Sequence, residues 1–147
     1  MQEESERREV INQCLKLIKA GGDINCFIYI CLCTIIECLL NYPQDIKEHK
    51  NRLLQYFSDG LHKTMYGFTD AYFIDPENIE ALFSNYTSLK TERIMATEGL
   101  GNICEAALMQ LPEDKFMEWI DLLYKISDKK AVWGSCAHMI YLGRKKD

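Results

Sequence analysis

The sequence contains little proline and glycine, and no stretch is rich in glycine and serine or in proline. Three prolines and eight glycines are scattered over 147 residues, so no flexible linker divides the chain. Hydrophobic residues make up 48% and charged residues 27%. This composition excludes a disordered chain and lets a protein of this length bury a core. We therefore expect one domain over residues 1–147 that folds without a metal ion or a disulfide.

The sequence also lacks a stripe of basic side chains. The formal net charge is −5, and the basic residues are dispersed apart from Arg144, Lys145 and Lys146. Proteins that bind nucleic acid normally cluster lysine and arginine against the phosphates, so we do not expect direct nucleic-acid binding. A mildly acidic surface suits a basic protein partner instead, because complementary charge steers association.

No hydrophobic run is long enough to cross a membrane. Residues 24–40 are the most apolar, but Asn25, Thr34 and Glu37 interrupt them, and a span requires roughly 20 apolar residues. The preceding segment begins with acidic residues at positions 3, 4 and 6, unlike the basic start of a secretory signal. We expect a cytoplasmic protein in which residues 24–40 form a buried core helix.

The hydrophobic spacing predicts helices along the whole chain and no alternating strand pattern. Gly21-Gly22, Pro43 and the pair Asp75-Pro76 supply helix stop and start signals. The predicted helices cover residues 3–20, 23–42, 46–57, 61–72, 76–86, 91–111, 112–126 and 127 or 128 to 143. The second is apolar almost all round, which predicts that Phe27, Ile30, Leu32 and Ile35 are among the most buried residues.

These segments predict an all-α fold of about eight helices in a single domain. Helices that contain small residues begin near Arg93 and Lys130, a spacing of about 37 residues that is close to that of HEAT and armadillo repeats. The two candidate architectures are therefore an irregular helical bundle and a short HEAT/armadillo-like α-solenoid.

Seven cysteines, an odd number, argue against a secreted disulfide framework. We expect reduced thiols packed inside helices. Cys26, Cys31, Cys33 and Cys38 have a spacing that suggests a metal site. On one helix, however, they would form two pairs on different faces, each separated by about 10 Å along the axis. One zinc ion could not reach all four sulfurs, so we expect no metal and no cofactor.

Recognisable catalytic motifs are missing from the sequence. The histidines, at positions 49, 62 and 138, are far apart, and there is no nucleophile elbow, phosphate-binding loop or dinucleotide fingerprint. Gly99-Leu100-Gly101 is better explained by close helix packing. We therefore predict that the protein is not an enzyme.

Acidic residues recur at helical spacing in the last third of the chain. Asp114, Glu118 and Asp121 lie at i, i+4 and i+7 of the helix that begins at Pro112. The carboxylates of such a stripe are ordinarily solvated, and a neighbour such as Lys125 partly balances their charge. The functional interpretation is that the stripe forms a binding surface for a basic partner. The preceding predicted helix adds a second acidic row to this surface. The predicted partner-binding residues are Glu98, Glu105, Glu113, Asp114, Glu118 and Asp121.

In its small size, acidic charge, cysteine content and lack of catalytic motifs, the chain resembles the immunity proteins of bacterial contact-dependent growth inhibition and related toxin systems. The resemblance implies a cytoplasmic inhibitor that covers the active site of a cognate toxin, often a basic nuclease, with carboxylates in place of phosphates. Two alternatives stay open. A Bcl-2-like helical adaptor would bind a partner helix in an exposed apolar groove, and a helical enzyme would direct carboxylates into a pocket.

Overall fold

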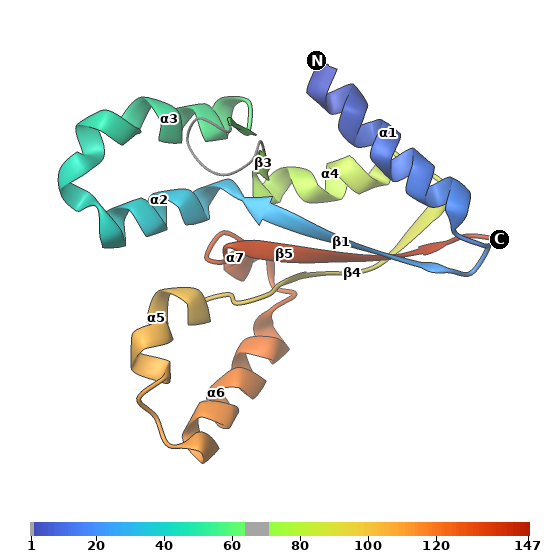
Figure 1. Ribbon diagram of the computed structural model, residues 1–147. Coiled ribbons are helices and arrows are strands. Elements are labelled where there is room, and N and C mark those ends of the chain that lie inside the picture. Colours follow the sequence, from blue (N-terminus) through green and yellow to red (C-terminus); the bar gives the residue numbers. More distant parts are fainter. Residues whose placement is uncertain (1, 64–70) are drawn as a thin grey trace.

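A computed structural model describes residues 2–63 and 71–147 of the chain. Helices and strands are interspersed along the sequence (Figure 1). The elements are α1 (Gln2–Leu17), β1 (Asp23–Ile30), α2 (Cys31–Asn41), η1 (Pro43–Asp45), α3 (Ile46–Ser58), β2 (Leu61–His62), β3 (Ala71–Ile74), η3 (Pro76–Asn78), α4 (Ile79–Ser84), β4 (Leu89–Ala96), α5 (Gly101–Leu108), α6 (Glu113–Ile126), α7 (Lys130–Trp133) and β5 (His138–Lys145).

The strands form one mixed five-stranded sheet with the order β2-β3-β1-β5-β4. β1 lies parallel to β3 and antiparallel to β5, which it pairs from Asp23 opposite Arg144 to Tyr29 opposite His138. β4 continues the sheet antiparallel to β5, with a register shift between Thr91 and Arg93. The protein is therefore an α/β protein. The prediction of an all-α bundle or α-solenoid was wrong.

The predicted helix over residues 23–42 is half strand, and this changes which of its side chains are buried. In β1 the buried side chains include Ile24, Ile28 and Ile30, whereas Phe27 is 61% exposed. Side chains on a strand alternate between faces, so Phe27 points away from the core. Ile30 is fully buried, as predicted. The prediction was wrong for Phe27 and also for Leu32, which is 37% exposed. Ile35 is only partly buried.

Two further predicted helices also contain strands. Residues 89–96 form β4 ahead of the helix α5, and residues 138–145 form β5, where buried Met139 and Tyr141 alternate with partly buried neighbours. The ends of the predicted helix over residues 61–72 are strands β2 and β3. Its middle lies outside the described residues.

Other predicted helices are present near their expected positions: α1, α3 and α6. The start signal at Asp75-Pro76 is confirmed, because Asp75 Oδ1 accepts a hydrogen bond from the Glu77 backbone amide at 3.0 Å. These segments carry strong local signals, namely amphipathic spacing or a capping residue followed by proline.

The main core lies on the face of the sheet covered by α1 and α4, with α7 adding Val132 and Trp133 (Figure 1). The rings of Phe83 in α4 and Tyr141 in β5 are stacked, with centroids 3.5 Å apart and planes 7° from parallel. A second, smaller cluster joins α2 to α3 through Cys31, Cys38, Leu53 and Tyr56. The α5–α6 hairpin extends from the opposite face of the sheet. None of the residues of its two helices, all within the described chain, is buried.

Gly60 ends the turn between α3 and β2 with a φ of +72°. A Cβ there would overlap the carbonyl oxygen of Phe73 and the ring of Tyr72. We expect Gly60→Ala to incur the left-handed backbone strain of about 1–2 kcal/mol and a further cost of about 1–3 kcal/mol for overpacking. Gly21→Ala is the matched control, because φ is +74° and a Cβ would have open space. If urea unfolding shows equal losses of unfolding free energy for the two variants, there is no additional overpacking cost at Gly60.

Candidate functional site

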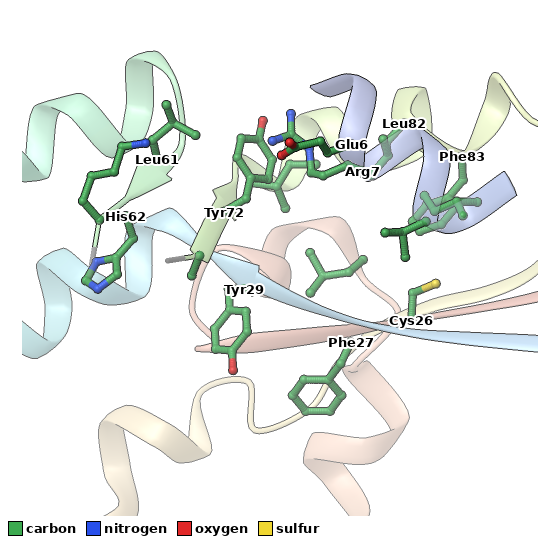
Figure 2. A pocket seen from close by; sticks show the side chains of 16 residues that line it. Glu6, Arg7, Cys26, Phe27, Tyr29, Leu61, His62, Tyr72, Leu82 and Phe83 are labelled. Carbon is green, nitrogen blue, oxygen red and sulfur yellow. The ribbon is translucent and has the colours of Figure 1, made fainter. Parts of the chain in front are cut away.

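The face of the sheet opposite the core carries exposed aromatic side chains. Phe27 and Tyr29 of β1 are 61% and 44% exposed, and Figure 2 shows both pointing to the opposite side of β1 from Phe83. The register places Phe27 beside Ile140 of β5, and Ile140 beside Met95 of β4. An apolar strip therefore crosses three strands toward the α5–α6 hairpin. We call Phe27, Ile140 and Met95 the sheet strip.

An acid–base pair lies at the end of the same face. Glu98 Oε1 is 2.8 Å from His138 Nδ1, and Glu98 Oε2 accepts a hydrogen bond from the Thr97 hydroxyl at 2.5 Å. The His138 ring lies between Phe27 and Tyr29, with centroid distances of 5.1 and 5.0 Å. Partial burial acts to raise the pKa of Glu98, but the hydrogen bonds from Thr97 and His138 outweigh it, so this pKa lies below its ordinary value.

This pair also fastens β4 to β5. The Thr97 amide donates to the His138 carbonyl oxygen at 3.1 Å, and the His138 amide donates to Glu98 Oε2 at 3.3 Å. The Thr97 hydroxyl lies 2.5 Å from Glu98 Oε2 and 2.8 Å from the His138 carbonyl oxygen. These contacts place the hydroxyl between two acceptors, the Glu98 carboxylate and the His138 carbonyl oxygen, and so hold the ends of the two strands together.

The lowered pKa of Glu98 gives a testable dependence of stability on pH. A carboxyl whose pKa is lower in the folded state stabilises the fold above its unfolded pKa, and this stabilisation is lost as the pH falls through the folded pKa. We therefore expect Glu98→Gln to be less stable than the parent near neutral pH. The difference should shrink below pH 4.5, the ordinary value for glutamate. Urea unfolding of both proteins over this range measures it, and a constant difference would exclude the ionised carboxylate as its cause.

Glu98 and Glu105 both line one cavity of about 450 Å³ between β4 and the α5–α6 hairpin. Besides these two carboxylates, the residues that line it are mainly apolar: Met95, Ala96, Leu108, Met109, Phe116, Ile120, Leu123 and Tyr124. Met95 belongs to both the sheet strip and the cavity wall, so the two apolar surfaces are continuous. We call this space the hairpin cavity.

The other predicted partner-binding residues lie on the exposed surface of α6. Glu118 and Asp121 border a shallow depression together with Lys115 and Lys125. It also contains Trp119 and Leu122, whose exposed fractions are 48% and 46%. Asp121 is paired with Lys125 at 2.5 Å. Asp114 is paired with Lys115 at 3.4 Å, and Glu113 is exposed near the start of the helix. With four carboxylates and two lysines, α6 carries a net charge of −2.

The two acidic rows do not merge into one surface. Glu98 precedes α5 and Glu105 lies within it, and both face the hairpin cavity, whereas Glu118 and Asp121 border the depression on α6. Sequence reasoning missed the aromatic residues beside His138, although the β-branched and aromatic run Ile28-Tyr29-Ile30 could have indicated a strand.

A third cavity, of about 510 Å³, lies between α1, β1, β3 and α4 (Figure 2). Its walls are largely apolar and include Val10, Ile28 and Leu82. The guanidinium carbon of Arg7 lies 3.4 Å from the centroid of the Tyr72 ring. Glu6, Arg7 and Lys63 also line this cavity, so side chains of both signs of charge are present.

Three cysteines of the suspected metal motif are distributed over two elements. Cys26 lies on β1, and Cys31 and Cys38 lie on α2, so the single-helix geometry assumed from the sequence does not apply to all of them. Among residues 2–63 and 71–147, no group of three or more histidine, cysteine or acidic side chains is placed to hold a metal ion. No helix in the same described ranges is both long and apolar enough to cross a membrane.

Comparisons with known proteins add no assignment to this geometry. No model of a known protein family matches the chain, and no curated protein matches it.

Proposed function

We propose that this protein acts by binding a basic protein partner, and that the exposed surface of α6 is a principal contact. One observation carries the proposal: Trp119 and Leu122 are about half exposed in a depression that Glu118, Asp121, Lys115 and Lys125 also line. Tryptophan dominates the energy of many protein interfaces. The net charge of −2 on α6 as a whole would steer a basic partner to this helix.

The packing of the hairpin supports an interface there. Its two helices bury no side chain in this chain, although the sequence of α6 is rich in large apolar residues. Those exposed on it are Met117, Trp119, Ile120, Leu122 and Tyr124. Ile120 and Tyr124 line the hairpin cavity, and Trp119 and Leu122 lie in the depression on α6. Exposed apolar side chains grouped in this way usually mark interaction sites. A partner that covered α6 would remove this surface from water.

The partner class that we propose is a toxin domain with a basic active site, which this protein would inhibit by occlusion. Inhibition would then need no chemistry from this chain, because an acidic surface over the toxin's substrate site excludes the substrate by charge and by volume. The adaptor alternative assumed an all-helical groove, which the mixed sheet does not provide.

Reversing two charges on α6 should slow association with the partner. We expect Glu118→Lys with Asp121→Lys to lower the on-rate by about tenfold at low salt, and the difference should fade as added salt screens it. Fold stability should change little, since the exposed Asp121–Lys125 pair contributes little. Stopped-flow binding to the purified partner measures the rates.

The matched control makes the same change in net charge on α2 and α3, through Glu37→Lys with Glu48→Lys, both exposed. Similar slowing by both double variants would indicate a general charge effect and would contradict α6 as the contact surface. Inhibition itself is tested by producing the protein in cells that carry the genes encoded next to it. Failure to protect those cells from any neighbouring toxin would overturn the toxin assignment.

A further inference from the structure

The hairpin cavity has apolar walls that can hold an alkyl chain. Met95, Phe116, Ile120 and Leu123 line it from β4 and α6, and the sheet strip extends the same apolar surface across β5 to β1. Its volume of about 450 Å³ lies within the usual range for pockets that bind specific ligands. An occupant with an apolar stem would therefore be shielded from water on several sides.

The charge around this cavity has one dominant sign. Of the described residues that line it, Glu98 and Glu105 are charged and none is lysine, arginine or histidine. Arg93 contacts the rim through the Tyr124 hydroxyl at 3.0 Å, but Asp128 lies 3.9 Å from the same guanidinium group. A charged occupant would thus meet carboxylates, and one of opposite sign is favoured.

Glu98 presents a negative charge to the cavity, although its carboxylate already has several hydrogen-bond partners. His138 contacts Oε1, while Thr97 and the His138 amide contact Oε2, and the Glu98 backbone adds a further hydrogen bond. A carboxylate offers about four acceptor positions, so a new cation would interact with Glu98 mainly through charge. Glu105 is exposed and can turn toward the same ligand.

We propose that the hairpin cavity receives a basic side chain of the protein partner, with its alkyl stem against Met95 and Ile120 and its cationic head on Glu98 and Glu105. This inference rests on the proposed function and specifies a second contact of the same interface. Arginine fits better than lysine, because its planar guanidinium group can donate to two carboxylates and stack on the ring of Phe116. The Tyr124 ring already has the guanidinium group of Arg93 at 5.0 Å from its centroid.

The chemistry of the cavity can be tested without the partner by using methionine methyl groups as reporters. Met95 and Met109 line the cavity, whereas Met139 is buried in the core and Met117 lies exposed on α6 outside the lining. With ¹³C-methyl methionine labelling, we expect hexylguanidinium to shift the Met95 and Met109 signals and to leave those of Met117 and Met139 in place. Hexanol and hexanoate should shift them much less. Equal shifts with hexanol would reduce the site to a hydrophobic pocket and overturn the proposal.

Variants separate the roles of the two carboxylates from a general charge effect. Glu105→Gln should weaken hexylguanidinium binding by about threefold to tenfold without disturbing the fold, because Glu105 is exposed. Glu98→Gln should act in the same direction. Glu37→Gln with Glu48→Gln removes two exposed charges from α2 and α3, outside the cavity lining, and should leave binding unchanged. An equal loss with this control would contradict a specific site.

Peptides then distinguish an arginine side chain of a protein partner from a small organic cation as the occupant of the cavity. A short arginine peptide should shift the same two methyl signals, and a peptide with neutral citrulline in place of arginine should not. If hexylguanidinium enters the cavity but the arginine peptide does not, the occupant is a small organic cation and the side-chain assignment fails. The α6 charge reversal is measured with the partner itself. If the α6 charge reversal leaves the on-rate of the partner unchanged while the arginine peptide still binds in the cavity, the proposed function is contradicted and the cavity proposal is not.

Discussion

Replacing Tyr141 with alanine is expected to lower the free energy of unfolding by about 3–5 kcal/mol. Tyr141 is fully buried in β5, the strand between β1 and β4, and its ring stacks on Phe83. Removing it would leave a cavity between the sheet and α4, where the strand backbone prevents collapse. Urea unfolding monitored by circular dichroism measures the loss.

Tyr141→Phe is the control that separates ring packing from the hydroxyl group. The Tyr141 hydroxyl lies 3.2 Å from the hydroxyl of Thr91, and one such hydrogen bond contributes about 0.5–1.5 kcal/mol. The phenylalanine variant should therefore retain most of the stability. If it destabilised the protein as much as the alanine variant does, ring packing against Phe83 would not be the main contribution.

Replacing Trp119 with alanine is expected to have the opposite profile, with little effect on folding and a large effect on binding. The side chain is about half exposed on α6, so stability should change by no more than about 0.5 kcal/mol. Loss of a central tryptophan from an interface lowers the binding free energy by about 2 kcal/mol or more. This corresponds to a dissociation constant that is roughly thirtyfold larger. Isothermal titration calorimetry with the purified partner provides the measurement.

Phe57→Ala is the matched aromatic control, since Phe57 is similarly exposed on α3. It should leave the affinity unchanged. Weaker binding in the Phe57 variant together with normal binding in the Trp119 variant would move the interface from α6 to the α2–α3 pair.

The helices that could be predicted from the sequence are those with strong local patterns. α6 combines a start after Pro112 with apolar residues at helical spacing, and η3 begins at Pro76, directly after the capping residue Asp75. The strands lacked comparable local signals. β1 and α2 are continuous in sequence and both apolar, and a short apolar run does not distinguish a strand from a buried helix. β4 carries exposed Lys90 and Glu92, which resemble the polar side of an amphipathic helix.

The candidate site was only partly predictable for a related reason. Acidic spacing identified Glu118 and Asp121 because both lie on one helix. The meeting of Glu98 with His138 depends on β4 lying beside β5, a pairing between segments about 40 residues apart. No local pattern encodes such a contact. The turn at Gly99, with a φ of +52°, then leads the chain from Glu98 into α5, where the sequence had suggested an unbroken helix.

The order of the strands has a consequence for synthesis of the protein on the ribosome. β5 lies between β1 and β4 and is the last of the five strands along the chain. Until residues 138–145 emerge, β1 and β4 have no strand between them, and Ile28 and Ile94 lack their partners Met139 and Tyr141. The complete sheet can therefore form only after nearly all of these 147 residues have been translated. Until then, the nascent chain exposes unpaired strand edges that are prone to aggregation.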